Sequence, residues 1–364
     1  MGTANPGVEA GTVVWRESSP PSCREPDTLF PVPPPAPPAL SPPTSAAGAW
    51  GLSRPALGLA LAGAHGPDQL ERQRRQVALA ESLGFHSIWL PEMHFATGGC
   101  PAPLVELARH AFTAPSLRFG TTSLLLPLHP PERIAAEIAA LDRLTAGRVL
   151  VGLGRGFQKR MLEAFGVPPA EKRDRFDAAL DRLFALWAEG NETGSALATA
   201  TRPHPPLAVA AFGPKGLAQA ARRGLPYLAS PVETLERIAE NQARHRALLP
   251  PGSERPLSLV MRTVFVSRSE TERDRARRSL ERETAGRRSG MPDRIREALA
   301  APLDERAIIG TVDEVRHRLI LDRRRLEIDL LIVRAGLQGI ERRALDESLA
   351  LLAREIWPSV IAGD

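Results

Sequence analysis

The sequence predicts an α/β fold, a closed (β/α)8 barrel, from three observations. Short apolar runs alternate with amphipathic helical segments through most of the 364 residues. The runs are apolar throughout, which is typical of parallel strands covered on both faces. About eight runs and about eight helices occupy roughly 300 residues, which favours a closed barrel over an open doubly wound sheet. No G-x-G-x-x-G follows the first run, so a dinucleotide-binding fold is disfavoured.

The expected strands and helices alternate in order along the chain. The strands are predicted at 56–63, 85–92, 117–127, 148–156, 206–213, 226–230, 257–267 and 328–336. Helical spacing of apolar residues predicts helices at 67–84, 101–114, 131–147, 175–190, 216–224, 232–249 and 341–357, with an Arg-rich helical stretch before the last strand. The first of these helices ends in Gly84, a residue common just past a helix end.

Residues 1–53 differ in composition from the remainder. The stretch "PVPPPAPPALSPPTSAAGA" contains too much proline to pair in a sheet or to sustain a helix. We expect a disordered proline-rich tail over 1–53 and the barrel over 54–364. A polyproline ligand for an adaptor domain is the less favoured reading of the tail.

Composition and charge exclude several classes of protein. The chain is 43% apolar and 24% charged, as in globular proteins. Charges interrupt every long apolar stretch and no secretion signal opens the chain, so we expect a cytoplasmic protein with no membrane contact. Cys23 and Cys100 are the only cysteines, too few for a disulfide framework. The net charge of +5 is scattered among acids and there is one Tyr, so no nucleic-acid partner is expected.

Ionisable groups follow the second predicted strand, in "SIWLPEMHF". Polar groups at the end of a buried strand cost free energy unless they are hydrogen-bonded or functional. The C-terminal ends of barrel strands carry the active site, so Glu92, Met93 and His94 are the candidate catalytic residues. The alternative is a capped strand followed by a loop.

The third predicted strand has two small polar residues, Thr122 and Ser123, in an apolar run. Small residues at this position would let a flat ligand approach the backbone. Hydroxyl groups satisfied within the strand are an equally good explanation.

The fourth and fifth strand ends have features of a phosphate site. Arg155 lies in the glycine-rich "VGLGRG", where backbone can approach a ligand, and Arg173 near the next helix start could add a second guanidinium. Taken alone, Arg173 would be a surface charge. In "AAFGPKGLAQAA" a helix opens near Gly213, Lys215 and Gly216, and backbone amides at a helix N-terminus favour phosphate.

The sequence shows no metal-ligand spacing and no G-x-S-x-G elbow. A flat, phosphorylated organic cofactor therefore fits the strand ends better than a metal site or a nucleophile.

Together these motifs resemble the bacterial luciferase-like flavin monooxygenases over most of residues 56–358. The resemblance is densest in "ESLGFHSIWLPEMHF", in "LLLPLHPPERIAAEIAALDRLTAGRVLVGLGRGF" and in "AIIGTVDEV" before the last strand, which contains a G-T-x-x-E-V turn. It implies a barrel, commonly a homodimer, that binds reduced FMN and activates oxygen to oxygenate a small-molecule substrate. It also implies a separate flavin reductase as a partner.

By position, the resemblance gives roles to particular residues. Arg155 and Arg173 correspond to the two arginines that grip the FMN phosphate. Thr122 and Ser123 correspond to residues against the isoalloxazine ring, where the family often has a non-proline cis peptide. Glu92 and His94 correspond to the polar ends of the "E-H-H-F" signature, with Met93 between them.

Two departures from the family pattern leave the chemistry open. Met93 replaces a histidine that is important in the luciferase α subunit, and Met cannot move a proton. His94 cannot simply substitute, because successive strand residues face opposite ways. Gly213 and Gly216 stand where the luciferase α subunit has hydroxyl residues, and the "GPK" turn is more similar to relatives that use a deazaflavin.

A lid insertion is expected near 282–302, where relatives carry a mobile insertion. Gly286, Gly290 and Pro292 could serve as hinges there, although an ordinary solvated helix pair is a comparable reading.

Three hypotheses for function follow. The leading one is a two-component monooxygenase that uses reduced FMN and molecular oxygen. The alternatives are a deazaflavin-dependent hydride-transfer oxidoreductase and a non-catalytic flavin-binding partner subunit.

Overall fold

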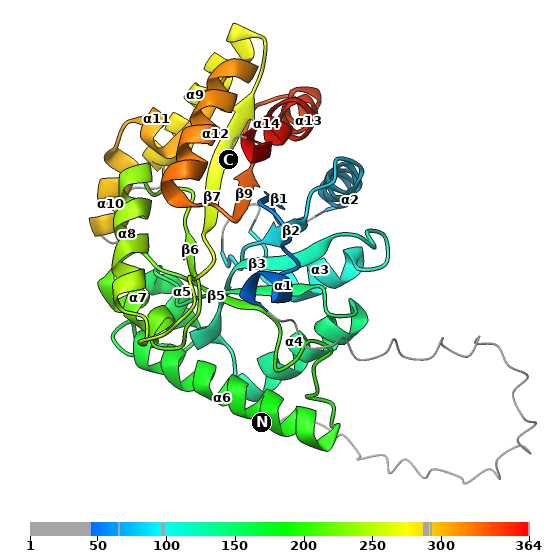
Figure 1. Ribbon diagram of the computed structural model, residues 1–364, viewed down its shortest axis with the longest axis vertical. Helices are drawn as coiled ribbons and strands as arrows, with labels where there is room; N and C mark the ends of the chain where they lie inside the picture. The colour runs from blue at the N-terminus through cyan, green and yellow to red at the C-terminus, as the bar shows by residue number, and fades with distance from the viewer. Residues whose placement is uncertain (1–44, 65, 96–98, 287–290, 292, 363–364) are drawn as a thin grey trace, which may run out of the picture. The chain divides into compact units, whose positions relative to one another are not determined.

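The computed structural model describes residues 45–64, 66–95, 99–286, 291 and 293–362 (Figure 1). Residues 1–44 of the proline-rich tail expected over 1–53 lie outside the described residues. Within the described part no helix combines the length and the apolar character that crossing a membrane requires.

Eight parallel strands close into a barrel, as the sequence predicts. Consecutive strands from β1 to β7 pair in parallel, and β9 pairs with both β7 and β1. The strands of the barrel are β1 (Ala56–Ala60), β2 (Ser87–Leu90), β3 (Arg118–Leu125), β4 (Val149–Gly154), β5 (Leu207–Ala210), β6 (Tyr227–Ala229), β7 (Leu259–Val266) and β9 (Leu330–Arg334).

A ninth strand, β8 (Ala307–Gly310), was not expected and covers the first four residues of "AIIGTVDEV". β7 is long enough for two partners: Leu259–Thr263 pair with β9, and Thr263–Val266 pair with β8. β8 therefore extends the sheet beyond the barrel wall. The expected turn follows it, where Thr311 and Glu314 form a capping box at the start of α12 (Val312–Leu326).

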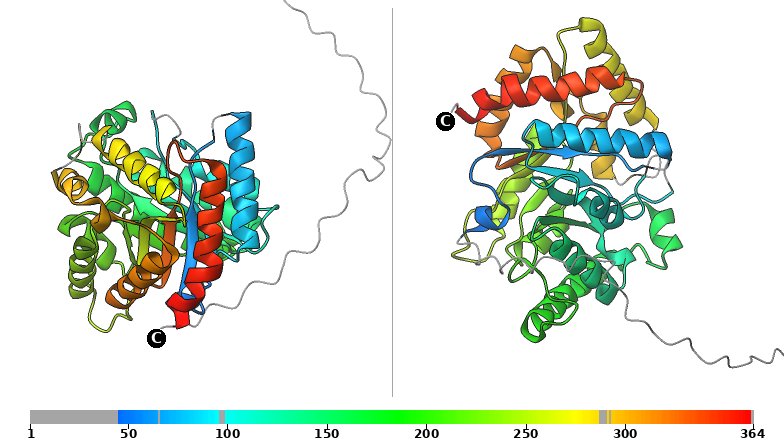
Figure 2. Two further views of the ribbon diagram at one scale, coloured as in Figure 1. Left: turned by 90° about the horizontal axis from the view of Figure 1, so that it is seen from above. Right: turned by 90° about the vertical axis from the view of Figure 1, so that its right-hand side faces the viewer.

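Helices form the outer layer around the strands (Figure 2). Their apolar faces pack against the outward-facing strand residues in one continuous core. The longer ones are α2 (Pro67–Ser82), α3 (Pro103–His110), α4 (Pro131–Leu144), α6 (Lys172–Thr193), α7 (Pro214–Ala221), α8 (Leu235–Ala247), α9 (Glu270–Gly286), α10 (Asp293–Ala300) and α13 (Arg342–Leu351). The short elements are α5 (Lys159–Ala164), η1 (Leu126–Leu128), α11 (Leu303–Arg306), η2 (Leu352–Ile356) and α14 (Trp357–Ala362).

The segment just before β1 folds into the N-terminal end of the barrel, so the boundary expected at residue 53 lies too late. Ser45 caps a short helix, α1 (Ala46–Ala49). Trp50 follows it with only 3% of its surface exposed, and its ring stacks on Trp89 of β2 at a centroid distance of 6.4 Å. Burying a large indole ring stabilises this segment, although the composition of the flanking residues favours turns. This segment belongs with the inner core of the barrel.

Candidate functional site

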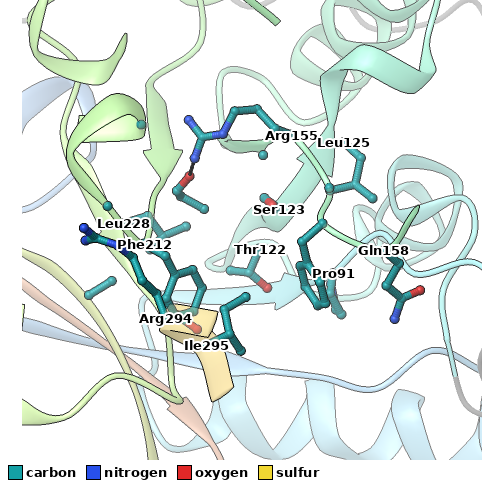
Figure 3. Close-up of a pocket in the computed structure, with 18 of the residues that line it drawn as sticks. Pro91, Thr122, Ser123, Leu125, Arg155, Gln158, Phe212, Leu228, Arg294 and Ile295 are labelled. Carbon is teal, nitrogen blue, oxygen red and sulfur yellow. Dashed lines mark hydrogen bonds between the residues drawn. The ribbon is translucent and has the colours of Figure 1, made fainter. Parts of the chain in front are cut away.

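A cavity of about 890 Å³ lies among the segments that follow strands β2 to β6, where the strands have their C-terminal ends (Figure 3). Apolar side chains form much of its wall, namely Met93, Leu125, Met161, Phe212, Leu228, Met261 and Ile295. Cationic side chains are also part of the lining, namely Arg155, Lys172, Arg173, Lys215, Arg237 and Arg294. An apolar cavity with a few polar groups is typical of a small-molecule site.

Arg155 is fixed in the cavity wall just beyond β4. Its Nη2 donates to the carbonyl oxygen of Ala210 at 2.6 Å, and its Nη1 donates to Oε1 of Gln219 at 3.0 Å. The guanidinium also lies over the ring of Phe176, 5.4 Å from its centroid. A Cβ atom added at Gly216 would lie 2.7 Å from Nη2 of Arg155, so glycine leaves room for the guanidinium.

Positive charge is crowded on this side of the cavity. Burial, followed by the nearby charge of Arg173, lowers the pKa of Arg155 to about 10. Burial also lowers the pKa of Lys172, with smaller contributions from Arg173 and Arg155. Each of these groups would gain from a bound anion, because an anion offsets both desolvation and mutual repulsion.

Gln219 of α7 connects this cluster to the start of α6, and sequence reasoning missed it. Its Nε2 donates to the carbonyl oxygen of Arg173 at 3.0 Å and to Oδ2 of Asp177 at 2.8 Å, while its Oε1 accepts from Arg155. The only signal in the sequence is a polar residue inside an Ala-rich helix, at the position facing the strand ends.

The helix α7 opens onto the cavity with Gly213 as its N-cap and Pro214 at its first position. Lys215 and Gly216 follow in the first turn and line the cavity. Arg294 of α10 lies against this turn, since its Nη1 would be 3.1 Å from a Cβ atom at Gly213 (Figure 3). The residues predicted to bind phosphate at the fourth and fifth strand ends thus surround one cavity.

Thr122 and Ser123 line the cavity at the end of β3, and the peptide bond between them is cis. The register between β3 and β4 shifts between Thr122 and Leu124. A Cβ atom at Gly154 would lie 2.1 Å from Oγ of Ser123, so β4 must have glycine opposite this hydroxyl.

Glu92 and Met93 line the cavity, whereas His94 is not among the described residues that do. The Nε2 of His94 lies 2.7 Å from Oε1 of Glu92, and its ring lies 4.6 Å from that of Phe165. His94 thus contacts Glu92 rather than the cavity, and a direct action of His94 on a ligand stays a prediction. His129, which sequence reasoning missed, lies 3.0 Å from both oxygens of the same carboxylate.

The segment 282–302 contributes to the cavity wall through α10. Asp293, Arg294, Ile295 and Glu297 line the cavity. The suggested hinges Gly290 and Pro292 lie outside the described residues, and Gly286 ends α9. Most residues of α10 are exposed to solvent although four of them line the cavity, so both the lid and the ordinary solvated helix pair stay predictions.

A buried carboxylate supports the loop after β6, which gives Ser230 and Pro231 to the cavity wall. Glu233 accepts hydrogen bonds from Tyr227 Oη at 2.7 Å, Asn241 Nδ2 at 2.7 Å and the Ser230 amide at 2.8 Å. Burial nevertheless raises the pKa of Glu233 to about 7. Within the described part of the chain, no group of three or more His, Cys, Asp or Glu side chains could hold a metal ion.

The luciferase-like monooxygenase family model matches residues 53–329. The chain therefore belongs to the luciferase-like monooxygenase family, a family of oxidoreductases whose members are flavin-dependent, in agreement with the resemblance of its motifs.

Curated relatives match over parts of the chain. A 4-hydroxyprotoasukamycin monooxygenase of Streptomyces nodosus subsp. asukaensis is 34% identical over 116 residues, 31% of this chain and 31% of that protein. The oxygenase component of the flavin-dependent trigonelline monooxygenase of Acinetobacter baylyi is 26% identical over 208 residues, 53% of this chain and 58% of that protein. The match spans about half the length, 46% and 48%, of two uncharacterized proteins of Sinorhizobium fredii.

Solved structures share the fold. A monooxygenase from Streptomyces bottropensis has a TM-score of 0.71 at 24% identity, covering 83% of this chain and 99% of that one. The oxygenating constituent of 3,6-diketocamphane monooxygenase from Pseudomonas putida, in complex with FMN, has a TM-score of 0.70 at 17% identity, covering 84% and 98%. A coenzyme F420-dependent secondary alcohol dehydrogenase has a TM-score of 0.64 at 17% identity, covering 84% and 99%.

Replacement of Glu233 by Gln should change how stability depends on pH. Because the folded-state pKa is raised from 4.5 to about 7, this group stabilises the fold below pH 4.5 and loses that contribution as the pH rises toward 7. The free energy of unfolding of the wild type, relative to Glu233→Gln, should therefore fall between these pH values and level off above them. Urea denaturation at a series of pH values measures this, with the exposed Glu254→Gln as control. A difference that stays constant with pH would contradict the assignment.

Proposed function

We propose that the protein is the oxygenase component of a two-component monooxygenase, which takes reduced FMN from a separate flavin reductase and uses molecular oxygen to oxygenate a small organic substrate. The observation that carries the proposal is the cavity itself. Crowded cations Arg155, Lys172 and Arg173 lie beside the start of α7, and the wall around Thr122 and Ser123 is largely apolar.

The residues present fit FMN. A phosphate group would offset the burial and repulsion that lower the pKa of Arg155 and Lys172. The N-terminus of α7, from Gly213 to Gly216, lines the cavity, and the positive end of a helix favours an anion. The small side chains of Thr122 and Ser123 would let a flat ring approach the end of β3. The cations would thus bind the phosphate end of FMN, while the apolar wall would contact its ring.

Each part of the chain has a definite task in this proposal. Arg155, held by Ala210 and Gln219, binds the phosphate with little loss of side-chain freedom, because its geometry is already fixed. Reduced FMN, when bound, supplies the electrons that activate oxygen. The apolar wall excludes water and orients the substrate. Met93 contributes apolar surface at the position where acid–base chemistry would otherwise occur.

Reduced coenzyme F420 is the second candidate cofactor, which would make the protein a hydride-transfer oxidoreductase. Arg237 and Arg294 add two cations to the cavity lining beyond Arg155, Lys172 and Arg173. A deazaflavin with a longer anionic tail could use them. The third candidate is a non-catalytic flavin-binding partner subunit, which Met93 in place of the family histidine favours.

Oxygen consumption distinguishes these three functions. With NADH, FMN and a flavin reductase, we expect substrate-dependent oxygen uptake and an oxygenated product detected by mass spectrometry. The matched arm supplies reduced coenzyme F420 without a reductase and follows the oxidation of this coenzyme by substrate, because hydride transfer consumes no oxygen. Turnover in that arm alone would favour the hydride-transfer function, and turnover only after addition of a related chain would favour a partner subunit.

Removal of the Arg155 guanidinium should weaken FMN binding. Charge-assisted hydrogen bonds contribute about 1.5–3 kcal/mol, so Arg155→Leu should raise the Kd for FMN by about 10- to 100-fold. Fluorescence titration with FMN measures this, and Arg160→Leu, at an exposed position on α5, is the control. An unchanged Kd in a folded Arg155→Leu protein would remove Arg155 from the phosphate site.

We also propose a homodimer through α2 and α3. The two helices lie side by side, joined by the hydrogen bond from Gln73 Nε2 to Glu106 Oε2 at 3.0 Å. Val105 of α3 is 70% exposed, and Phe112, two residues beyond the end of α3, is 76% exposed. Exposed apolar groups of this size mark an interface when they gather on one face.

The double variant Val105→Asp and Phe112→Asp should be monomeric, because two desolvated carboxylates would face each other across the interface. Light scattering coupled to size exclusion measures the mass, with the exposed Leu248→Asp as control. A monomeric wild type, or a variant that stays dimeric, would contradict this interface.

A further inference from the structure

The carboxylate of Glu92 joins three segments behind the cavity wall. Oε1 lies 2.7 Å from Nε2 of His94 and 3.0 Å from Nε2 of His129. Oε2 lies 2.6 Å from the backbone nitrogen of Leu125 and 3.0 Å from the same His129 nitrogen. The Glu92 side chain is fully buried, and those of His94 and His129 are 10% and 23% exposed. Both oxygens of one buried carboxylate therefore have nitrogen partners.

The backbone of Glu92 acts on the same part of β3. Its amide donates to the carbonyl oxygen of Ser123 at 3.2 Å, while its side chain accepts from the amide of Leu125. Between these two bonds the register of β3 against β4 shifts, so the ladder does not fix Ser123 in the usual way. Glu92 therefore holds the end of β3 on both sides of Leu124, next to the cavity-lining Thr122 and Ser123.

The hydrogen bonds to Glu92 determine which ring nitrogen of each imidazole carries a hydrogen. An ionised carboxylate only accepts, so His94 and His129 must each carry a hydrogen at Nε2 to complete the arrangement. The turn η1 places His129 next to the Glu92 carboxylate. The backbone amide of His129 donates to the carbonyl oxygen of Leu126 at 3.2 Å. His94 is held from its other side by the ring of Phe165.

We infer that His129 and His94 are positioning residues, whose Nε2 hydrogens orient the Glu92 carboxylate and so hold Thr122 and Ser123 at the cavity. Neither imidazole is among the described residues that line the cavity, so both act through Glu92. The expected effect of the two histidines on cofactor binding rests on the proposed function. Their tautomers and their contact with Glu92 are independent of that function.

Nitrogen-15 NMR of protein with labelled histidine imidazoles tests the contact without any cofactor. At neutral pH we expect protonated Nε2 in both rings, assigned with His94→Gln and His129→Gln. Substitution Glu92→Gln should shift both Nε2 resonances, while the exposed His317 resonance stays unchanged. A neutral ring protonated only at Nδ1 in His129, or resonances that do not respond to Glu92→Gln, would overturn the inference.

Binding of FMN tests the positioning effect with a matched pair of variants. Glutamine places an amide N–H near the site of Nε2, whereas leucine has no donor. His129→Leu should weaken FMN binding by about tenfold, since small displacements at a site cost large factors, and His129→Gln should restore most of it. The control is His317→Leu.

Equal loss in the Leu and Gln variants, or no loss in either, would contradict positioning through a hydrogen bond. A wild type that binds neither FMN nor coenzyme F420 would instead refute the proposed function. In that case the NMR result would still decide whether the two histidines hold Glu92.

Discussion

Closure of the barrel by β9 is the constraint on which the remaining structure depends. β9 pairs with β1 over five residues, from Ala56 opposite Leu330 to Ala60 opposite Arg334, and on its other side with β7. A closed parallel sheet has no free edge, and its strands all end on the same face. Side chains far apart in sequence, from Glu92 to Arg294, therefore meet around one cavity. No short-range interaction would bring them together.

The chemistry of the cavity depends on how the fold manages buried charge. Arg155 lies in the wall with a carbonyl and an amide oxygen as its hydrogen-bond partners, and the charge of Asp177 also favours its protonated form. Glu92, by contrast, receives nitrogen partners on both oxygens. The carboxylate of Glu92 is thus held by donors from the protein, whereas the guanidinium of Arg155 lies at the cavity, as the proposed phosphate site requires. The two charged groups therefore differ in their surroundings, although both follow barrel strands.

Much of the fold was predictable because apolar runs and helical spacing are local patterns. The eight barrel strands follow from them, whereas β8 was missed because its apolar run is only four residues long and directly precedes the capping box of α12. Trp50 was missed because the flanking composition suggested a tail. The candidate cavity residues Arg155, Thr122 and Ser123 were found at strand ends, and Arg173 near the start of the helix that follows. His129 and Gln219 were not, since their partners are defined only by the packed structure.

The placement of Trp50 and β9 bears on how the protein can be shortened. The family match covers 53–329, yet Trp50 fills the base of the cylinder and β9 begins at Leu330. A fragment trimmed to the matched region would expose the indole ring of Trp89 to water. It would also leave β1 and β7 with unpaired backbone groups, which invite intermolecular sheet formation. The autonomous folding unit of this chain is therefore larger than the part that similarity to its family delimits.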